Sequence, residues 1–149
     1  MRNRSGFTII ELIFVLMLSG IVMAVGVQQY NRVANQRAVG NARDALILTS
    51  LRARSEAVRS GQLVHMRVRP DLGLVRVETS DGRVLHTLRS ADYRTQMVGS
   101  QLSVCYSSRG YALSGCTAGL GAERGVGFVR GRDTAAVSIL PLGQVRRRQ

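Results

Sequence analysis

An unbroken apolar segment near the N-terminus is the strongest constraint on how this chain of 149 residues can fold. The segment runs from Phe7 to Val27, and its 21 residues include one charged side chain, Glu11. A helix of about 20 apolar residues is long enough to cross a bilayer. A carboxylate inside such a helix is costly unless it has a partner or a purpose. The segment therefore predicts a membrane-length helix whose single carboxylate is functional.

The residues that flank this segment differ from those of a secretory signal peptide. In a signal peptide the small-residue cleavage site follows the apolar region. Ala24 and Gly26 are small, but no A-x-A-like site follows them, and the sequence continues into a helical pattern. Arg2 and Arg4 precede the apolar segment, and the positive-inside bias places them in the cytoplasm. We therefore expect a retained helix, with the rest of the chain exported.

The junction at residues 6–12, Gly-Phe-Thr-Ile-Ile-Glu-Leu, resembles the prepilin-peptidase site of the type IV pilin superfamily. In that family a cytoplasm-facing peptidase cuts after the Gly and methylates the new amino terminus. The Glu then neutralises the amino terminus of a neighbouring subunit. The resemblance implies cleavage between Gly6 and Phe7, N-methylation of Phe7, and Glu11 as the assembly carboxylate. The alternative is an uncleaved signal anchor in which Glu11 is incidental.

The helical pattern continues without Pro to about Ser60. Gly20 and Gly26 weaken helix propensity by about 1 kcal/mol each relative to Ala, so local melting between them is one hypothesis. Small and apolar residues recur at helical spacing along one stripe: Ala38, Ala42, Ala45, Leu46, Thr49, Ala53 and Ala57. A second stripe, Ile47, Leu51 and Val58, lies nearly opposite. The two stripes predict either two packing partners or one broad core face with scattered exposed apolar residues.

Beyond Gly61 the periodicity changes from helical to alternating. Val64, Met66 and Val68 alternate with polar residues, including His65 on the outward phase, and similar patterns follow at 75–77 and 84–88. Turn sequences at 70–73 and 80–82 separate these patterns. Later apolar patterns occur at 102–106, 126–128 and 137–139. Together they predict an α+β fold, in which a long N-terminal helix packs on an antiparallel β-sheet.

These patterns divide the chain into four parts. We expect a prepilin leader at residues 1–6, the transmembrane and assembly half of the helix at 7–27, its amphipathic half at 28–60, and a β-rich C-terminal globular domain at 61–149. Since 122 residues remain after the apolar segment, the exported part has room for one domain.

Three downstream segments resemble the GspH/FimT subgroup of minor pilins and pseudopilins. They lie at 52–58, 107–110 and 143–146 and follow the order of that subgroup, although Gln144 replaces the first Arg of a Gly-Arg-Val-Arg ending. The resemblance implies a subunit of a type II secretion pseudopilus or a type IV pilus. It implies single-pass anchoring in the bacterial inner membrane, with the C-terminal domain periplasmic or extracellular in a filament. The implied partners are prepilin peptidase, other pilin or pseudopilin subunits and the inner membrane.

Two cysteines, Cys105 and Cys116, lie in the exported part. In an oxidising compartment such a pair usually forms a disulfide. The closed loop is short, so the expected stabilisation is about 2–3 kcal/mol. No metal site is expected, because two thiols at this spacing, with only His65 and His86 elsewhere, do not make a tetrahedral set.

The sequence contains no recognisable catalytic constellation. It has no Gly-x-Ser-x-Gly elbow, and neither histidine lies near a plausible nucleophile in sequence. We therefore expect a protein that is not an enzyme and has no cofactor.

Every basic residue of the chain is Arg: 21 Arg stand against 9 acidic residues, for a net charge of +12. Guanidinium groups are suited to phosphate because they are planar, permanently charged and bidentate. Relatives in the subgroup include proteins that bind DNA for natural transformation through a basic C-terminal segment. The corresponding residues here are Arg130, Arg132 and a run expected to be a free tail, Arg146, Arg147 and Arg148. DNA is therefore an alternative partner; the other interpretation is a solvated basic surface in an Arg-biased proteome.

Overall fold

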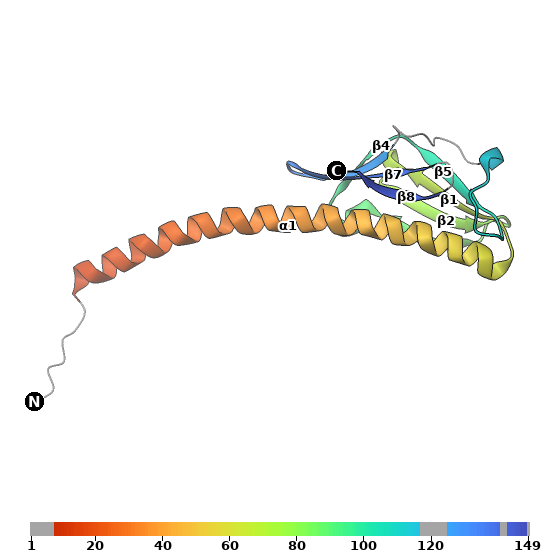
Figure 1. Cartoon of the computed structure of the whole chain (residues 1–149). Helices are drawn as coiled ribbons and strands as arrows, with labels where there is room; N and C mark the ends of the chain where they lie inside the picture. The colour runs from red at the N-terminus through yellow and green to blue at the C-terminus, as the bar shows by residue number, and fades with distance from the viewer. Residues whose placement is uncertain (1–7, 117–124, 141–142, 149) are drawn as a thin grey trace, which may run out of the picture. The chain divides into compact units, whose positions relative to one another are not determined.

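A computed structural model describes residues 8–116, 125–140 and 143–148 (Figure 1). One α-helix, α1 (Ile9–Ser60), comes first, and the described strands follow it. The chain divides into two compact units, Met1–Ala34 and Asn35–Gln149, which we describe separately. Helix and antiparallel sheets confirm the α+β prediction.

The first unit contains the N-terminal part of α1. The Thr8 hydroxyl oxygen accepts a hydrogen bond from the Glu11 backbone N–H at 3.4 Å, as in an N-terminal cap. Glu11 lies in the first helical turn, where a negative charge is stabilised by the helix dipole. The helix passes through Gly20 and Gly26 without a break, so this structure contains no local melting there.

The part of α1 in the second unit buries one face. Its buried residues are Val39, Ala42, Leu46, Thr49, Ser50, Ala53 and Ala57, which largely coincide with the predicted small-residue stripe. The second stripe is left mostly outward, since Leu51 and Val58 are both more than half exposed. Within the chain, the described residues therefore show one core face, and a second packing partner on the exposed stripe stays a prediction. The helix ends at Ser60, and Gly61 follows with φ +67°, a conformation that favours glycine.

The first sheet has the strand order β3-β2-β1-β5, with every neighbouring pair antiparallel. Its strands are β1 (Val64–Arg69), β2 (Leu74–Thr79), β3 (Val84–Arg89) and β5 (Leu102–Tyr106). The predicted meander forms β1 to β3. Strand β5 then pairs on the other side of β1, a neighbour that strand periodicity alone does not specify.

The second sheet has the order β4-β6-β7-β8, again antiparallel throughout. Its strands are β4 (Gln96–Gly99), β6 (Gly125–Arg130), β7 (Asp133–Ile139) and β8 (Val145–Arg148). The expectation that the C-terminal arginines form a free tail is wrong, because they belong to β8. The sequence analysis also missed β4. Each of these strands has four residues, too few to show a clear alternation.

Both sheets and α1 contribute to one hydrophobic cluster. Its fully buried members include Leu46 from α1, Met66 and Val77 from the first sheet, and Phe128 and Ile139 from the second. The second half of α1 is thus part of the core of the C-terminal domain.

Tyr106 joins three parts of this domain. Its phenol oxygen lies 2.7 Å from the Ser50 hydroxyl oxygen on α1, and it donates a weaker hydrogen bond to the Gly143 carbonyl at 3.4 Å. Burial raises the pKa of the Tyr106 phenol. Tyr106 is therefore a core residue, whereas Tyr111 is exposed.

Candidate assembly and binding sites

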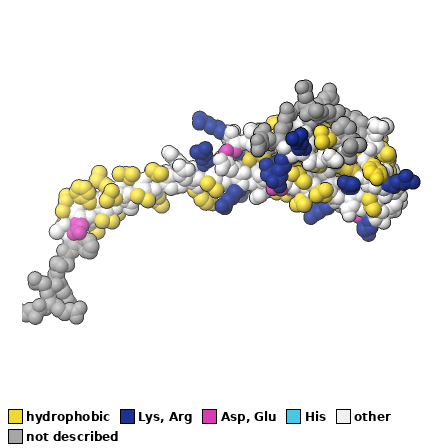
Figure 2. Space-filling view, viewed as in Figure 1, with side chains coloured by type: hydrophobic (Ala, Val, Ile, Leu, Met, Phe, Trp, Pro, Cys, Tyr) yellow, Lys and Arg dark blue, Asp and Glu magenta, His cyan; other side chains and the backbone are white. Residues whose placement is uncertain are grey.

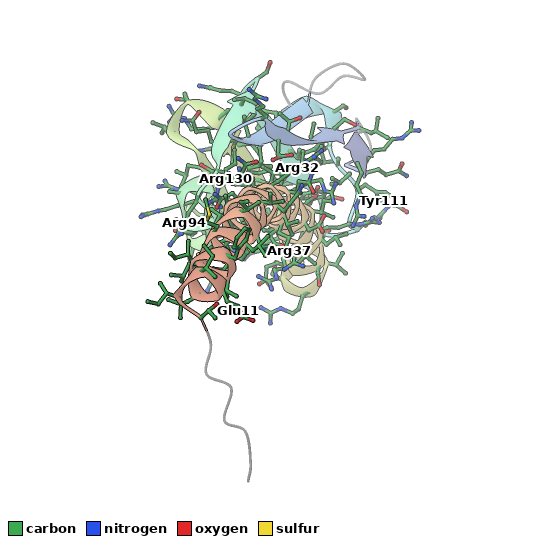
Figure 3. The ribbon with its side chains drawn as sticks, turned by 90° about the vertical axis from the view of Figure 1, so that its left-hand side faces the viewer. Glu11, Arg32, Arg37, Arg94, Tyr111 and Arg130 are labelled. Atoms are coloured by element: carbon green, nitrogen blue, oxygen red, sulfur yellow. A yellow bond between two sulfur atoms is a disulfide. The ribbon has the colours of Figure 1, made fainter. Side chains whose placement is uncertain are left out.

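Glu11 projects from the start of α1, and its side chain is exposed (Figure 3). Among the residues that the structure describes, its carboxylate has no ion-pair partner. Gly6 and Phe7, the expected cleavage and methylation positions, lie outside the described residues. The structure therefore places the carboxylate at the beginning of the apolar helix and leaves its pairing as a prediction.

The apolar side chains that follow Glu11 are exposed along the first unit. Figure 2 shows them covering this part of the helix. α1 is long and apolar enough there to cross a membrane by length and composition. Contiguous apolar surface of this extent marks contact with a membrane or with other proteins.

The structure pairs Cys105 with Cys116 as predicted, with the two Cα atoms 5.9 Å apart. Cys105 is on β5, and Cys116 ends the 3-10 turn η3 (Ser114–Cys116). The segment between them folds back on β5, because the Leu113 N–H donates to the Cys105 carbonyl at 2.9 Å. The residues that follow Cys116, 117–124, lie outside the described residues.

His65 lies beside this disulfide. Antiparallel pairing of β1 with β5 sets His65 opposite Cys105, and its Nδ1 is 3.2 Å from the Cys105 sulfur. The donor atoms of His65, Cys105 and Cys116 all lie within 4.8 Å of one another. The sequence analysis placed His65 on the outward phase of its strand and expected no metal site. Forty positions separate His65 from Cys105, and only the β1–β5 register reveals their proximity.

The side chains of Arg146 and Arg147 lie in different surroundings. On β8, Arg147 reaches Asp44 of α1, with 3.5 Å between its Nη2 and the carboxylate oxygen. Asp44 is also held by Arg43 at 3.0 Å. Arg146 is exposed.

Strand register brings another set of arginines to one end of the second sheet. Arg130 ends β6, and Arg132 lies in the turn that leads to β7. On the neighbouring strand, the backbone of Arg148 pairs with Ala136. Ala136 is three positions along β7 from Asp133, where that strand begins. At about 3.3 Å per residue, three positions correspond to about 10 Å along the strand. Arg94 precedes β4 at the same end, since Gln96 pairs with Val129. Figure 3 shows Arg94 and Arg130 on one side of the domain and Tyr111 on the other. We call Arg94, Arg130 and Arg132 the basic end.

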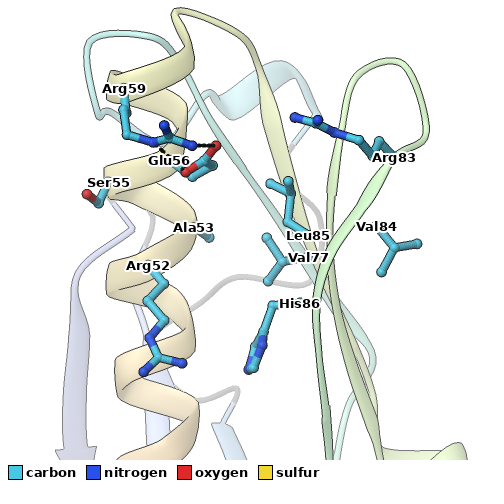
Figure 4. A pocket seen from close by; sticks show the side chains of 10 residues that line it. All are labelled: Arg52, Ala53, Ser55, Glu56, Arg59, Val77, Arg83, Val84, Leu85 and His86. Atoms are coloured by element: carbon cyan, nitrogen blue, oxygen red, sulfur yellow. Dashed lines mark hydrogen bonds and ion pairs between the residues drawn. The ribbon is translucent and has the colours of Figure 1, made fainter.

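A hollow of about 610 Å³ lies between the last turns of α1 and the β2–β3 hairpin (Figure 4). Its lining combines an apolar floor that includes Ala53, Val77 and Leu85 with cationic side chains from both walls. Figure 4 shows Arg52 and His86 on opposite walls.

One carboxylate in this hollow is already neutralised. Arg59 binds both carboxylate oxygens of Glu56, at 2.7 and 3.0 Å, and this hydrogen bonding lowers the Glu56 pKa. Arg52 and Arg83 form no ion pair with any residue that the structure describes. Such a lining is suited to an anionic group attached to an apolar body.

Comparison with known proteins bears on the N-terminus. Residues 1–27 match the family described as the prokaryotic N-terminal methylation motif. This is the type IV pilin signature. The motif supports a type IV pilin-like or pseudopilin subunit, a structural component rather than an enzyme, and the long helix with its β-sheets fits the pilin-like fold. No curated protein and no solved structure matches the chain.

The pilin signature also bears on partners and location. It implies processing by prepilin peptidase and assembly with other pilins. Together with the hydrophobic first part of α1, it fits a membrane-anchored protein that crosses the bilayer once.

Proposed function

We propose that this protein is a minor pilin or pseudopilin of the GspH/FimT type, inserted in the bacterial inner membrane and assembled into a type II secretion pseudopilus or a type IV pilus. Its C-terminal domain is then periplasmic, or extracellular in a filament. The observation that carries the proposal is the methylation motif, which leads directly into an exposed apolar helix with one carboxylate.

In this proposal prepilin peptidase cuts between Gly6 and Phe7 and methylates the Phe7 amine. The Glu11 carboxylate then pairs with the Phe7 amine of a neighbouring subunit. An ionised group in hydrocarbon is costly when alone, and an opposite charge offsets much of that cost. The pairing thus favours insertion of a new subunit beside an existing one, while the exposed apolar side chains exchange lipid for neighbouring helices.

The processing step provides the direct test. Intact mass spectrometry of the protein purified from its native host should give a chain that begins at N-methylated Phe7. Gly6→Val should abolish cleavage and leave the leader attached. Ser5→Ala, one position earlier, is the matched control and should be processed normally. A wild-type chain that retains residues 1–6 would refute the pilin function.

A second candidate function is DNA binding by the same subunit during natural transformation. The basic end supports it, because strand register places arginines from two separate segments of the chain at the same end of the second sheet. From Gln28 onward the chain has 19 Arg and 8 acidic residues, a net charge of +11. Clustered guanidinium groups bind phosphates independently of base sequence and in a salt-dependent manner.

A further inference from the structure

The three donors His65, Cys105 and Cys116 form a compact set with the composition of a soft-metal site. We propose that the dithiol form of this protein binds a thiophilic divalent cation of the Zn²⁺ type through His65 Nδ1 and the two cysteine sulfurs. The disulfide form cannot do so, because its sulfurs are bonded to each other. The site is thus an alternative to the disulfide, and it does not depend on the function proposed above.

The donors come from three different elements, so the fold assembles the site. His65 is held on β1, which is paired on both sides, by β2 and β5. Cys105 is buried on β5, and the partly exposed Cys116 lies on η3. Two of the three ligands therefore have fixed backbones, and the third lies at the surface where an ion can enter.

The distances suit a tetrahedral ion. Zinc binds sulfur at about 2.3 Å and imidazole nitrogen at about 2.0–2.1 Å, so its donors lie about 3.5–3.8 Å apart. The three donor atoms here lie within 4.8 Å of one another, and His65 Nδ1 is 3.2 Å from the Cys105 sulfur. Once the sulfur–sulfur bond is broken, a small separation of the sulfurs makes room for the ion. Three protein ligands leave one position for water.

Reduction of the disulfide must come before metal binding. A phosphine reductant attacks the disulfide and water completes the reaction: the sulfur–sulfur bond breaks, the water oxygen ends on the phosphine as phosphine oxide, and its two protons give two protein thiols. The cation then displaces one proton from each thiol and binds two thiolates and the neutral imidazole. Metal binding and disulfide formation exclude each other because both consume the same two sulfurs.

The test uses the full-length protein in detergent micelles, reduced with a phosphine that is then removed under nitrogen. Titration with Co²⁺, a coloured substitute for Zn²⁺, should give one equivalent of binding with a sulfur-to-cobalt charge-transfer band. Zn²⁺ should bleach that band. The oxidised protein should show no such band.

Two histidine variants separate this site from ordinary thiol binding. His65→Ala should weaken Co²⁺ binding at least tenfold, since even groups that merely orient a ligand contribute about 10–100-fold. His86→Ala removes a histidine from the hollow in Figure 4 and should bind Co²⁺ like the wild type. Circular dichroism of the oxidised variants checks that both are folded; if His65→Ala fails this check, His65→Gln replaces it. A reduced protein without the charge-transfer band, or equal affinity in a folded His65 variant, would overturn the proposal.

Discussion

The two units of this molecule differ in how far their apolar side chains are buried. In Asn35–Gln149 the apolar side chains of α1 and both sheets cover one another in a single cluster. In Met1–Ala34 the described apolar side chains are exposed, and several are more than 60% accessible. The second unit contains its own core, whereas no residue that the structure describes covers the apolar side chains of the first. Mutations in the two units should therefore fail in different ways, one in assembly and the other in folding.

The largest expected effect is on assembly. Glu11→Ala should insert into the membrane and leave unfolding of the C-terminal domain unchanged, but it should be nearly absent from filaments. Breaking a buried ion pair costs about 3–5 kcal/mol, which corresponds to more than a hundredfold in an equilibrium. The amount of variant in sheared filaments, relative to that in membranes, measures the effect. Asp92→Asn, an exposed carboxylate of the domain, is the control. If Glu11→Ala entered filaments at the wild-type level, the carboxylate would not be needed for assembly, and the expected difference between the two units would be refuted.

The reverse result is expected for the core. Leu46 is fully buried at the centre of the helix face, so Leu46→Ala should lower the free energy of unfolding by about 2–5 kcal/mol. Leu51→Ala, on the exposed side of the same helix, should change it by less than about 0.5 kcal/mol. Denaturant unfolding of both variants in micelles compares them. Equal losses would mean that the outward stripe is also covered.

A smaller effect is expected for DNA at the basic end. Arg130→Gln combined with Arg132→Gln should weaken DNA binding severalfold and reduce the slope of log affinity against log salt by up to about two. The matched control, Arg76→Gln with Arg89→Gln, removes the same charge from exposed positions on β2 and β3. Binding measured over a salt series distinguishes the two. Equal losses would indicate diffuse attraction and remove the support for DNA uptake.

The smallest effect concerns Tyr106. Because burial raises its pKa, the folded state favours the protonated phenol. The stabilisation from the protonated phenol is complete below about pH 10, the pKa of tyrosine in the unfolded chain. It is lost as the pH rises through the higher pKa of Tyr106 in the folded state. Tyr106→Phe should cost about 0.5–1.5 kcal/mol at neutral pH and flatten this alkaline decline. Thermal unfolding from pH 8 to 11 measures both. If Tyr106→Phe lost stability at alkaline pH as steeply as the wild type, groups other than Tyr106 would be responsible for that loss.

The sequence predicted the parts of the fold that have strong periodicity. The stripe containing Leu46 and Ala53 and the alternation around Met66 both reflect burial of one face, so pattern and structure agree. Strands β4 and β8 were missed because a four-residue strand is set by its partner rather than by its own pattern. In β8 the run of arginines also resembled a solvated tail, although pairing with β7 orders its backbone.

Some candidate sites could be predicted from local sequence, whereas others are formed only by strand pairing. Glu11 and the cysteines are recognisable in sequence, since each depends on local spacing. The contact of His65 with Cys105, and the placement of Arg94 and Arg130 at one end of the second sheet, depend on which strands are neighbours. That choice is made by packing over the whole domain, and no short stretch of sequence contains it.

The exposed edge of strand β8 affects how two copies of the domain can approach each other. It is the outer strand of its sheet, and an outer strand offers unpaired backbone groups to any second strand that approaches. Arg146 is exposed on it, and the Arg147 side chain is 65% accessible. Two copies that met edge to edge at β8 would bring these arginines close to their equivalents, and the like charges would repel, most strongly for Arg146, since Arg147 is paired with Asp44. This border of the domain thus discourages sheet-to-sheet fusion between copies, so that tightly packed copies stay separate folded bodies.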